Sequence, residues 1–172
     1  MSQPAKDAYW KPSYDTLYKA YYQEILSDAL VERWQGIDVA TALLVAATAS
    51  GSAFAGLALW SEPSLKIVWG IIAGVAAIAS IIRSVMGVTS RVKDQTDLRH
   101  AFLQLRVDVE TFRLQLAIEM NMDEAKNRFS ELRKTLAECL GRTSPDFAET
   151  KGLRSNVQKR LDDIMKAEGY SL

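Results

Sequence analysis

The sequence predicts an all-α fold: a two-transmembrane helical hairpin with an N-terminal amphipathic helix and a cytoplasmic helical bundle or coiled coil. Three observations support it. A central block is almost free of charge, apolar residues recur at helical spacing before it, and apolar residues alternate at spacings of four and three after it. The predicted regions are therefore residues 1–38, 39–90 and 91–172.

The composition excludes several classes of protein. The 172 residues are 48% apolar, which is incompatible with a disordered tail. The 21 basic and 21 acidic side chains cancel, so no nucleic acid is expected as a partner. A single cysteine cannot form an intramolecular disulfide, which fits a reducing compartment.

The first predicted helix starts near Pro12 and Ser13 and is rich in aromatic residues. Its apolar face holds Tyr14, Leu17, Tyr18, Tyr21, Tyr22, Ile25, Leu26, Leu30 and Trp34. Such a face could lie along the inner membrane surface or pack on the cytoplasmic helices. Four acidic residues between positions 24 and 38 favour packing, because an anionic leaflet would repel them.

The predicted hairpin has two uncharged arms. Val39–Trp60 is 22 residues long, or about 33 Å of helix, which is enough to cross a hydrocarbon core of about 30 Å. Ile67–Ile82 adds 16 uncharged residues, and Pro63 lies in the polar turn between the arms. In the first arm 14 of the 22 residues are Ala, Gly, Ser or Thr, so its lipid affinity is marginal.

The alternative to a membrane hairpin is a buried, Ala-rich hairpin inside a soluble bundle. The uniformly apolar second arm argues against it, since it has no polar face to turn toward water. Only Lys66 is basic near the turn, whereas the other ends of the arms carry several Arg and Lys residues. The positive-inside rule then places both termini in the cytoplasm and makes membrane lipid a partner.

Small and polar residues mark the candidate sites within the hairpin. Gly70 and Gly74 form a GxxxG pattern, which permits close approach of a neighbouring helix. Thr41, Thr48 and Ser52 share one face of the first arm. These residues either pack within the hairpin or line a water-filled pathway in an oligomer.

A candidate charge pair lies at the membrane mouth of the hairpin. Arg83 is about one turn inside the second arm, and Asp38 directly precedes the first. Arg83 could extend to the cytoplasmic headgroups or pair with Asp38.

The third predicted helix runs from about Arg91 to Met120. Its a/d pattern is typical of a coiled coil and predicts the seam of a homo-oligomer, formed by Leu98, Phe102, Leu105, Val109, Phe112 and Leu116. A second apolar stripe indicates that the helix contacts neighbours on two sides, through Leu103, Val107, Leu114 and Ile118.

Two shorter helices are predicted after a break at Asn121–Asp123. Asp123 is expected to cap the first of them, which ends at Gly141. The second starts at about Leu153, and the loop between the two helices could be mobile.

The sequence carries little reactive chemistry. His100 is the only histidine, so a metal site built on paired histidines is excluded. Cys139 lies between apolar residues and is expected to be a small core side chain. We therefore expect no catalytic residue, no metal and no cofactor, and the chain is not expected to be an enzyme.

Residues 10–120 resemble the SLATT family of two-transmembrane bacterial proteins. The resemblance lies in the aromatic helix running through Glu32–Gln35, the hairpin of small residues, and the amphipathic helix containing His100–Arg106. It implies a location in the bacterial inner membrane. It also implies a membrane-disrupting antiphage effector, triggered by a nucleotide-signalling or sensor partner protein.

Three functions follow as expectations. In the first, the protein oligomerises and, once triggered by a partner or ligand, permeabilises or depolarises the inner membrane. In the second, it is a constitutive membrane scaffold or transporter-associated subunit that recruits partners through its coiled coil. A phage-type holin is the third, although holins seldom need so large a cytoplasmic region.

Overall fold

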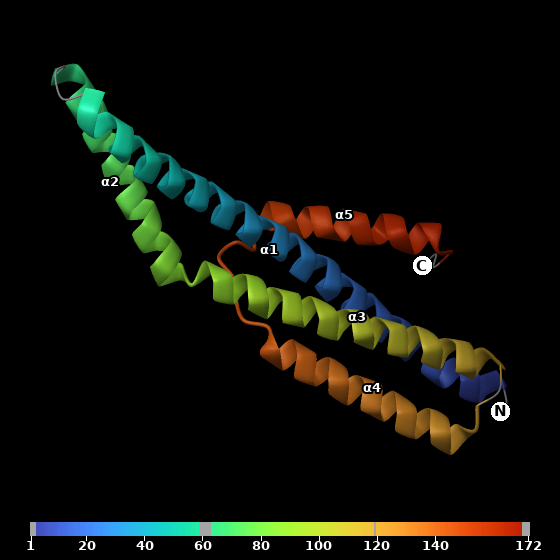
Figure 1. Ribbon diagram of the computed structural model, residues 1–172. Helices are drawn as coiled ribbons and strands as arrows, with labels where there is room; N and C mark the ends of the chain where they lie inside the picture. The colour runs from blue at the N-terminus through green and yellow to red at the C-terminus, as the bar shows by residue number, and fades with distance from the viewer. Residues whose placement is uncertain (1–2, 59–62, 119, 170–172) are drawn as a thin grey trace. The chain divides into compact units, whose positions relative to one another are not determined.

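The computed structural model describes the backbone of residues 3–58, 63–118 and 120–169 (Figure 1). Side chains are described for all residues in these ranges except 3–6, 48–58, 63–66, 69, 73, 82–84 and 86. The described residues form five helices and no strand, which confirms the all-α prediction. The helices are α1 (Gln3–Ala58), α2 (Pro63–Met86), α3 (Val88–Ile118), α4 (Met122–Arg142) and α5 (Lys151–Ala167).

The predicted transmembrane arms fall on the second half of α1 and on α2. Among the described residues, no helix combines the length and the apolar character needed to cross a membrane. The transmembrane part of the fold prediction is thus not borne out there.

The chain divides into two compact units. Unit 1 comprises Met1–Val31 and Asp94–Leu172, and unit 2 comprises Glu32–Lys93. In unit 1, α4 packs through Phe129 against Phe112 of α3 and Tyr9 of α1, with ring centroids 5.8 and 5.7 Å apart. α5 lies beside α1, where Tyr18 donates a hydrogen bond to Asp162 (Figure 1).

The core of unit 1 is the seam predicted from the sequence. Leu98, Phe102, Leu105, Val109, Phe112 and Leu116 are all buried, and four of the six are completely inaccessible. α1 contributes the buried side chains Leu17, Ala20 and Ile25 to unit 1, and α5 contributes Leu153, Val157, Leu161 and Met165. The heptad spacing therefore marks the core of a single chain.

Two helix starts differ from prediction. Pro12 lies inside α1, and Thr16 donates to its carbonyl oxygen at 2.9 Å. The N-cap of α4 is Asn121, whose side chain accepts from Asp123 N at 2.8 Å, so Asp123 instead occupies the first turn. That position still places its charge favourably at the positive end of the helix.

The ends of α2 and α4 also differ from prediction. Gly87, with φ of 57°, separates α2 from α3 within residues 39–90, which we expected to form the hairpin. α4 continues past Gly141 to Arg142, with Thr143 as its C-cap. The connection to α5 is tied down by Asp146, which is buried and accepts from Ala148 N at 2.9 Å.

Candidate functional site

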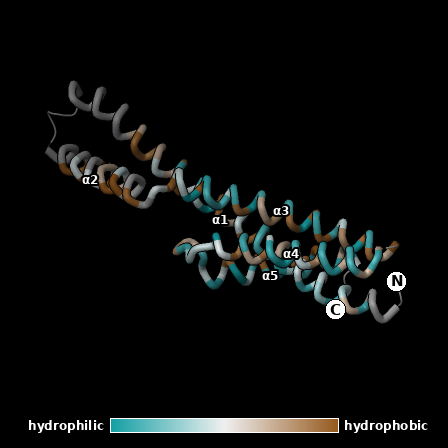
Figure 2. Tube along the Cα trace, turned by 90° about the horizontal axis from the view of Figure 1, so that it is seen from below, coloured by the Kyte–Doolittle hydropathy of each residue, from teal (hydrophilic) through white to brown (hydrophobic). Residues whose placement is uncertain are grey.

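Unit 2 carries an exposed apolar surface that is mostly on α2. On α2 the exposed side chains are Ile67, Val68, Ile71, Ile72, Val75, Ile78, Ile81 and Val85, and α1 adds Val39 and Leu43. Figure 2 shows α2 coloured as hydrophobic along much of its described length. At 100° per residue, the α2 positions span about half of the helix circumference. We call these ten residues the apolar surface of unit 2.

The GxxxG pair lies on the same helix. Gly70 and Gly74 are both exposed, and a Cβ atom added to either would meet no heavy atom within 4 Å. The close helix contact that this pattern permits is therefore not made by these glycines within the described part of one chain. The two positions remain accessible to a helix of another copy.

The structure describes only part of the predicted stripe and charge pair. The Thr41 hydroxyl is close to the carbonyl oxygens of Ile37 and Asp38, at 2.8 and 2.9 Å, and donates to its own helix. Such a bond satisfies the hydroxyl locally, as expected for a packed threonine. The side chains of Thr48, Ser52 and Arg83 lie outside the description, so their roles and the Asp38–Arg83 pair stay predictions.

The predicted oligomer seam is covered within one chain, as described above. A contact between copies through Phe102 or Phe112 would require the core of unit 1 to open. The second predicted stripe is the exposed one: Val107, Leu114 and Ile118 expose 43%, 66% and 77% of their surface. This face of α3 is available for association.

A polar cluster centred on Arg106 connects three helices of unit 1. Arg106 Nε lies 2.8 Å from Glu24 Oε2, in an ion pair without an aligned hydrogen bond. Its Nη1 donates to the Tyr21 hydroxyl at 2.8 Å and lies 3.4 Å from Glu110. Tyr21 donates in turn to Glu168 at 2.9 Å, which ties the end of α5 to α1.

Burial sets the ionisation of this cluster. It raises the pKa of Tyr21 to about 12, with the hydrogen bond to Glu168 acting in the same direction. Burial also raises the pKa of the Glu24 carboxyl, although the Arg106 charge opposes that shift. Sequence reasoning did not find the cluster, because members such as Tyr21 and Arg106 are 85 positions apart and no pattern in the sequence links them.

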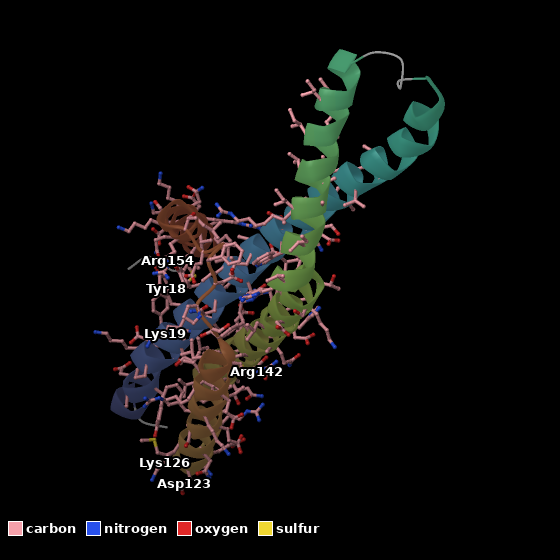
Figure 3. All side chains as sticks on the ribbon, turned by 90° about the vertical axis from the view of Figure 1, so that its left-hand side faces the viewer. Tyr18, Lys19, Asp123, Lys126, Arg142 and Arg154 are labelled. Atoms are coloured by element: carbon pink, nitrogen blue, oxygen red, sulfur yellow. The ribbon has the colours of Figure 1, made fainter. Side chains whose placement is uncertain are left out.

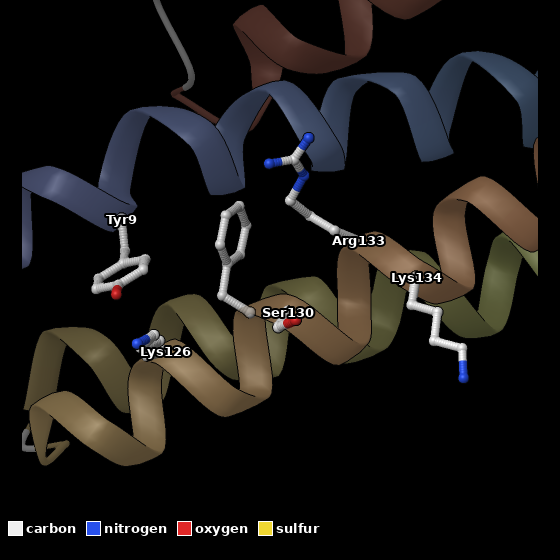
Figure 4. Close-up of a pocket in the computed structure, with 6 residues that line it drawn as sticks. Tyr9, Lys126, Ser130, Arg133 and Lys134 are labelled. Atoms are coloured by element: carbon white, nitrogen blue, oxygen red, sulfur yellow. The ribbon is translucent and has the colours of Figure 1, made fainter.

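A basic groove lies between the start of α1 and α4. Its volume is about 410 Å³, and Tyr9, Lys126, Phe129, Ser130, Arg133 and Lys134 line it. In Figure 4, Arg133 extends toward α1 while Lys134 points away from Tyr9. Lys134 is 3.9 Å from Glu138, and both side chains are well exposed to solvent. Because solvent screens such charges, the groove could attract an anion only weakly.

The described residues offer no evident centre for catalysis. Within residues 3–58, 63–118 and 120–169, no group of three His, Cys, Asp or Glu side chains could hold a metal ion. Cys139 is buried, which raises the pKa of its thiol. His100 is exposed on α3. Figure 3 shows that charged side chains such as Asp123, Lys126 and Arg142 are spread along α4 and form no convergent set.

Comparisons of this chain with protein-family models, curated proteins and solved structures found no match. Of the segments that carry the family resemblance, the aromatic helix lies in α1 and the amphipathic helix in α3. Trp34 is fully buried in α1, with the Arg91 guanidinium 5.9 Å from the centroid of its ring. His100–Arg106 forms part of α3.

Proposed function

We propose that this protein is a bacterial membrane effector that acts through unit 2. In this proposal it oligomerises, and a partner or ligand triggers it to permeabilise or depolarise the inner membrane. Unit 2 contacts the lipid, and both chain termini remain on the cytoplasmic side. The observation that carries the proposal is the apolar surface of unit 2.

That surface is energetically costly in water. Burying one large aliphatic side chain contributes about 1.5–3 kcal/mol. Covering ten partly exposed ones would therefore contribute on the order of 10 kcal/mol. Monomeric soluble proteins rarely expose a continuous apolar surface of this extent, so it indicates a contact with lipid or with another chain.

The distribution of residues favours lipid over a protein partner. Protein interfaces combine an apolar centre with a polar rim and are enriched in Arg and aromatic residues. Between Ile67 and Ile82 there is no charged residue, and aliphatic side chains spread over about half of α2. Hydrocarbon chains can cover so wide a surface without needing polar contacts.

Flotation with vesicles of phosphatidylcholine and phosphatidylglycerol tests the lipid contact. The wild type should float, and the double variant Ile71→Lys/Ile78→Lys should stay at the bottom of the gradient. Leu114→Lys/Ile118→Lys is a matched control, since it places the same two charges at exposed apolar positions of unit 1. Equal flotation of both variants would assign the lipid contact elsewhere, and a wild type that does not float would refute the proposal.

Extraction of the bound vesicles with alkaline carbonate separates insertion from surface adsorption. Inserted protein stays in the pellet, whereas adsorbed protein is released. Membrane depolarisation on induction, with the product of the neighbouring gene co-expressed as the candidate triggering partner, then tests the effector activity itself.

The alternative is a constitutive scaffold, which the exposed stripe of Val107, Leu114 and Ile118 on α3 favours. A scaffold would bind membranes without depolarising them, even in the presence of an active partner. Membrane potential therefore distinguishes the two functions.

A further inference from the structure

A pocket of about 330 Å³ lies in unit 1 between α1, α3 and the segment that joins α4 to α5. Its apolar lining includes Leu26, Leu30 and Leu98. Its polar lining includes Gln23, Ser27 and Gln95, which carry two side-chain amides and one hydroxyl. Its volume falls within the range of small-molecule sites, which begins at about 300 Å³.

Two of the polar lining residues are buried. Ser27 exposes 3% of its surface and Gln95 exposes 6%. The Gln95 amide donates to Asp146 at 3.4 Å, and Asp146 is itself 94% buried, since it exposes 6%. This contact holds the joining segment against α3 and orients the amide in the pocket wall. Buried polar groups are costly unless they form hydrogen bonds, so a pocket that presents them suits a ligand with matching groups.

The charges at the pocket mouth cancel one another. Arg154 Nε lies 2.7 Å from Glu149 Oε1, and both residues line the pocket. Asp146 places a further negative charge behind Gln95. An anionic ligand would have to displace Glu149 from Arg154 and approach a buried carboxylate, which disfavours it.

We infer that this pocket binds a small, uncharged molecule that has both an apolar part and hydrogen-bonding groups. Leu26, Leu30 and Leu98 offer contacts to the apolar part, and Gln23, Ser27 and Gln95 offer hydrogen bonds. A heterocyclic carboxamide combines an apolar ring with a donor and an acceptor.

A ligand in this pocket can influence unit 2 because of where the pocket lies along the chain. α1 is continuous from Leu30 into unit 2, and α3 is continuous from unit 2 to Gln95. A molecule held between α1 and α3 acts on the two helices that enter unit 2. This regulatory role rests on the proposed effector function, whereas binding itself does not.

Nicotinamide and its charged analogue nicotinate are suitable probes, with binding to the full-length protein measured by saturation-transfer NMR. Nicotinamide should bind saturably, and nicotinate about tenfold more weakly or worse. Ser144→Trp, at the exposed mouth of the pocket, should weaken nicotinamide binding at least about tenfold. Ser130→Trp, at an exposed serine of the basic groove, should leave it unchanged.

Binding outcomes decide the inference without reference to membranes. Absence of saturable nicotinamide binding, equal binding of the two probes, or normal binding by Ser144→Trp would overturn it. Ser144→Trp is on the surface, so a folding defect is not expected, and its circular dichroism spectrum checks this. If nicotinamide binds as expected but wild-type protein never floats with vesicles, the pocket assignment stands and the effector proposal fails.

Discussion

Arg106 Nη1 donates to the hydroxyl of Tyr21 at 2.8 Å, and the guanidinium carbon of Arg106 lies 4.4 Å from the centroid of the same ring. One arginine thus contacts both the polar edge and the apolar face of one tyrosine, with Glu24 and Glu110 as its ionic partners. Since Tyr21 also bonds to Glu168, the contact couples α1, α3 and the residue after α5. It fixes the relative positions of the helices in unit 1.

Arg106→Leu should destabilise unit 1 substantially. The substitution leaves the Glu24 carboxylate, which is 18% exposed, without its nearest positive charge. Removing one partner of a largely buried pair costs about 2–4 kcal/mol. The measurement is urea unfolding followed by circular dichroism, in which the midpoint should fall.

Arg128→Leu provides the control for that experiment. Arg128 is 3.7 Å from Glu131, and both side chains are largely exposed. Exposed pairs of this kind contribute about 0–1 kcal/mol, so the midpoint should barely change. If both variants had equal midpoints, the Arg106 cluster would have no special part in stability.

Tyr21 should be a late-titrating tyrosine. The unfolded chain releases this proton near its ordinary pKa of 10.0, whereas burial and Glu168 raise the pKa to about 12 in the folded state. The folded state therefore binds more protons between these values. The contribution of protonated Tyr21 to the free energy of unfolding is fully present below pH 10.0 and is lost as the pH rises through about 12.

Absorbance of tyrosinate during an alkaline titration measures this behaviour. Glu168→Gln should move the late component to lower pH, because it removes the charge that opposes formation of tyrosinate. Tyr21→Phe should remove that component. An unchanged titration curve for both variants would show that Tyr21 ionises like the other tyrosines.

The core of unit 1 could be predicted from the sequence because heptad spacing depends only on helix geometry. Leu98, Phe102 and Phe112 are buried as their spacing requires. Which helices cover them could not be predicted, since an apolar seam attracts a second copy as well as another helix of the same chain. Within one chain, Phe129 of α4 stacks on Phe112 and α1 contacts α3 through Tyr21 and Arg106, so the seam is buried, and the oligomer contact stays a prediction.

The Arg106 cluster and the pocket beside Gln95 could not be found from the sequence. Both depend on pairs such as Gln95 and Asp146, which are 51 positions apart and carry no periodic signal. The break at Gly87 was missed for a different reason. Hydropathy identifies an uncharged run, but a positive φ within the run depends on local backbone geometry.

Phe112→Ala should destabilise unit 1 at every protein concentration rather than merely separate copies. Phe112 is completely buried and stacks on Phe129, so truncation removes its transfer free energy and leaves a cavity. Such substitutions cost about 3–5 kcal/mol. Urea midpoints measured at two protein concentrations check this, because loss of a contact between copies would depend on concentration.

Leu114→Ala on the same helix is the matched control. Leu114 exposes 66% of its surface, so the free energy of unfolding should change by no more than about 0.5 kcal/mol. A concentration-dependent loss in Phe112→Ala, with the monomer still folded, would restore the seam as an oligomer contact.

Gly87→Ala should weaken the junction between α2 and α3. The residue has a φ of 57°, and a Cβ there would lie 2.9 Å from Ser90 Oγ. A left-handed conformation costs a residue with a side chain about 1–2 kcal/mol. Gly70→Ala, where a Cβ meets nothing within 4 Å, should instead be neutral or slightly stabilising to the monomer. Thermal unfolding by circular dichroism compares the two, and an equal loss in both would contradict the role given to Gly87.

The last prediction separates a water-filled pathway from a packed hairpin in unit 2. If Thr41, Thr48 and Ser52 face water in the triggered state, Ser52→Leu should obstruct or dewet the pathway, while Ser52→Asn should still conduct. If they only pack, both larger side chains should disturb assembly. Thr41→Val complements the pair, because the Thr41 hydroxyl bonds to its own backbone and its loss should change packing little.

Depolarisation in cells and oligomer mass, measured at equal protein levels and with the neighbouring gene product co-expressed, decide between these outcomes. A pathway predicts that Ser52→Leu assembles normally but depolarises less than the wild type. Equal depolarisation by the wild type and Ser52→Leu would remove this face from the pathway. If the wild type causes no depolarisation while its partner is active, the scaffold function accounts for the protein better than the effector function. A scaffold binds the membrane without opening it.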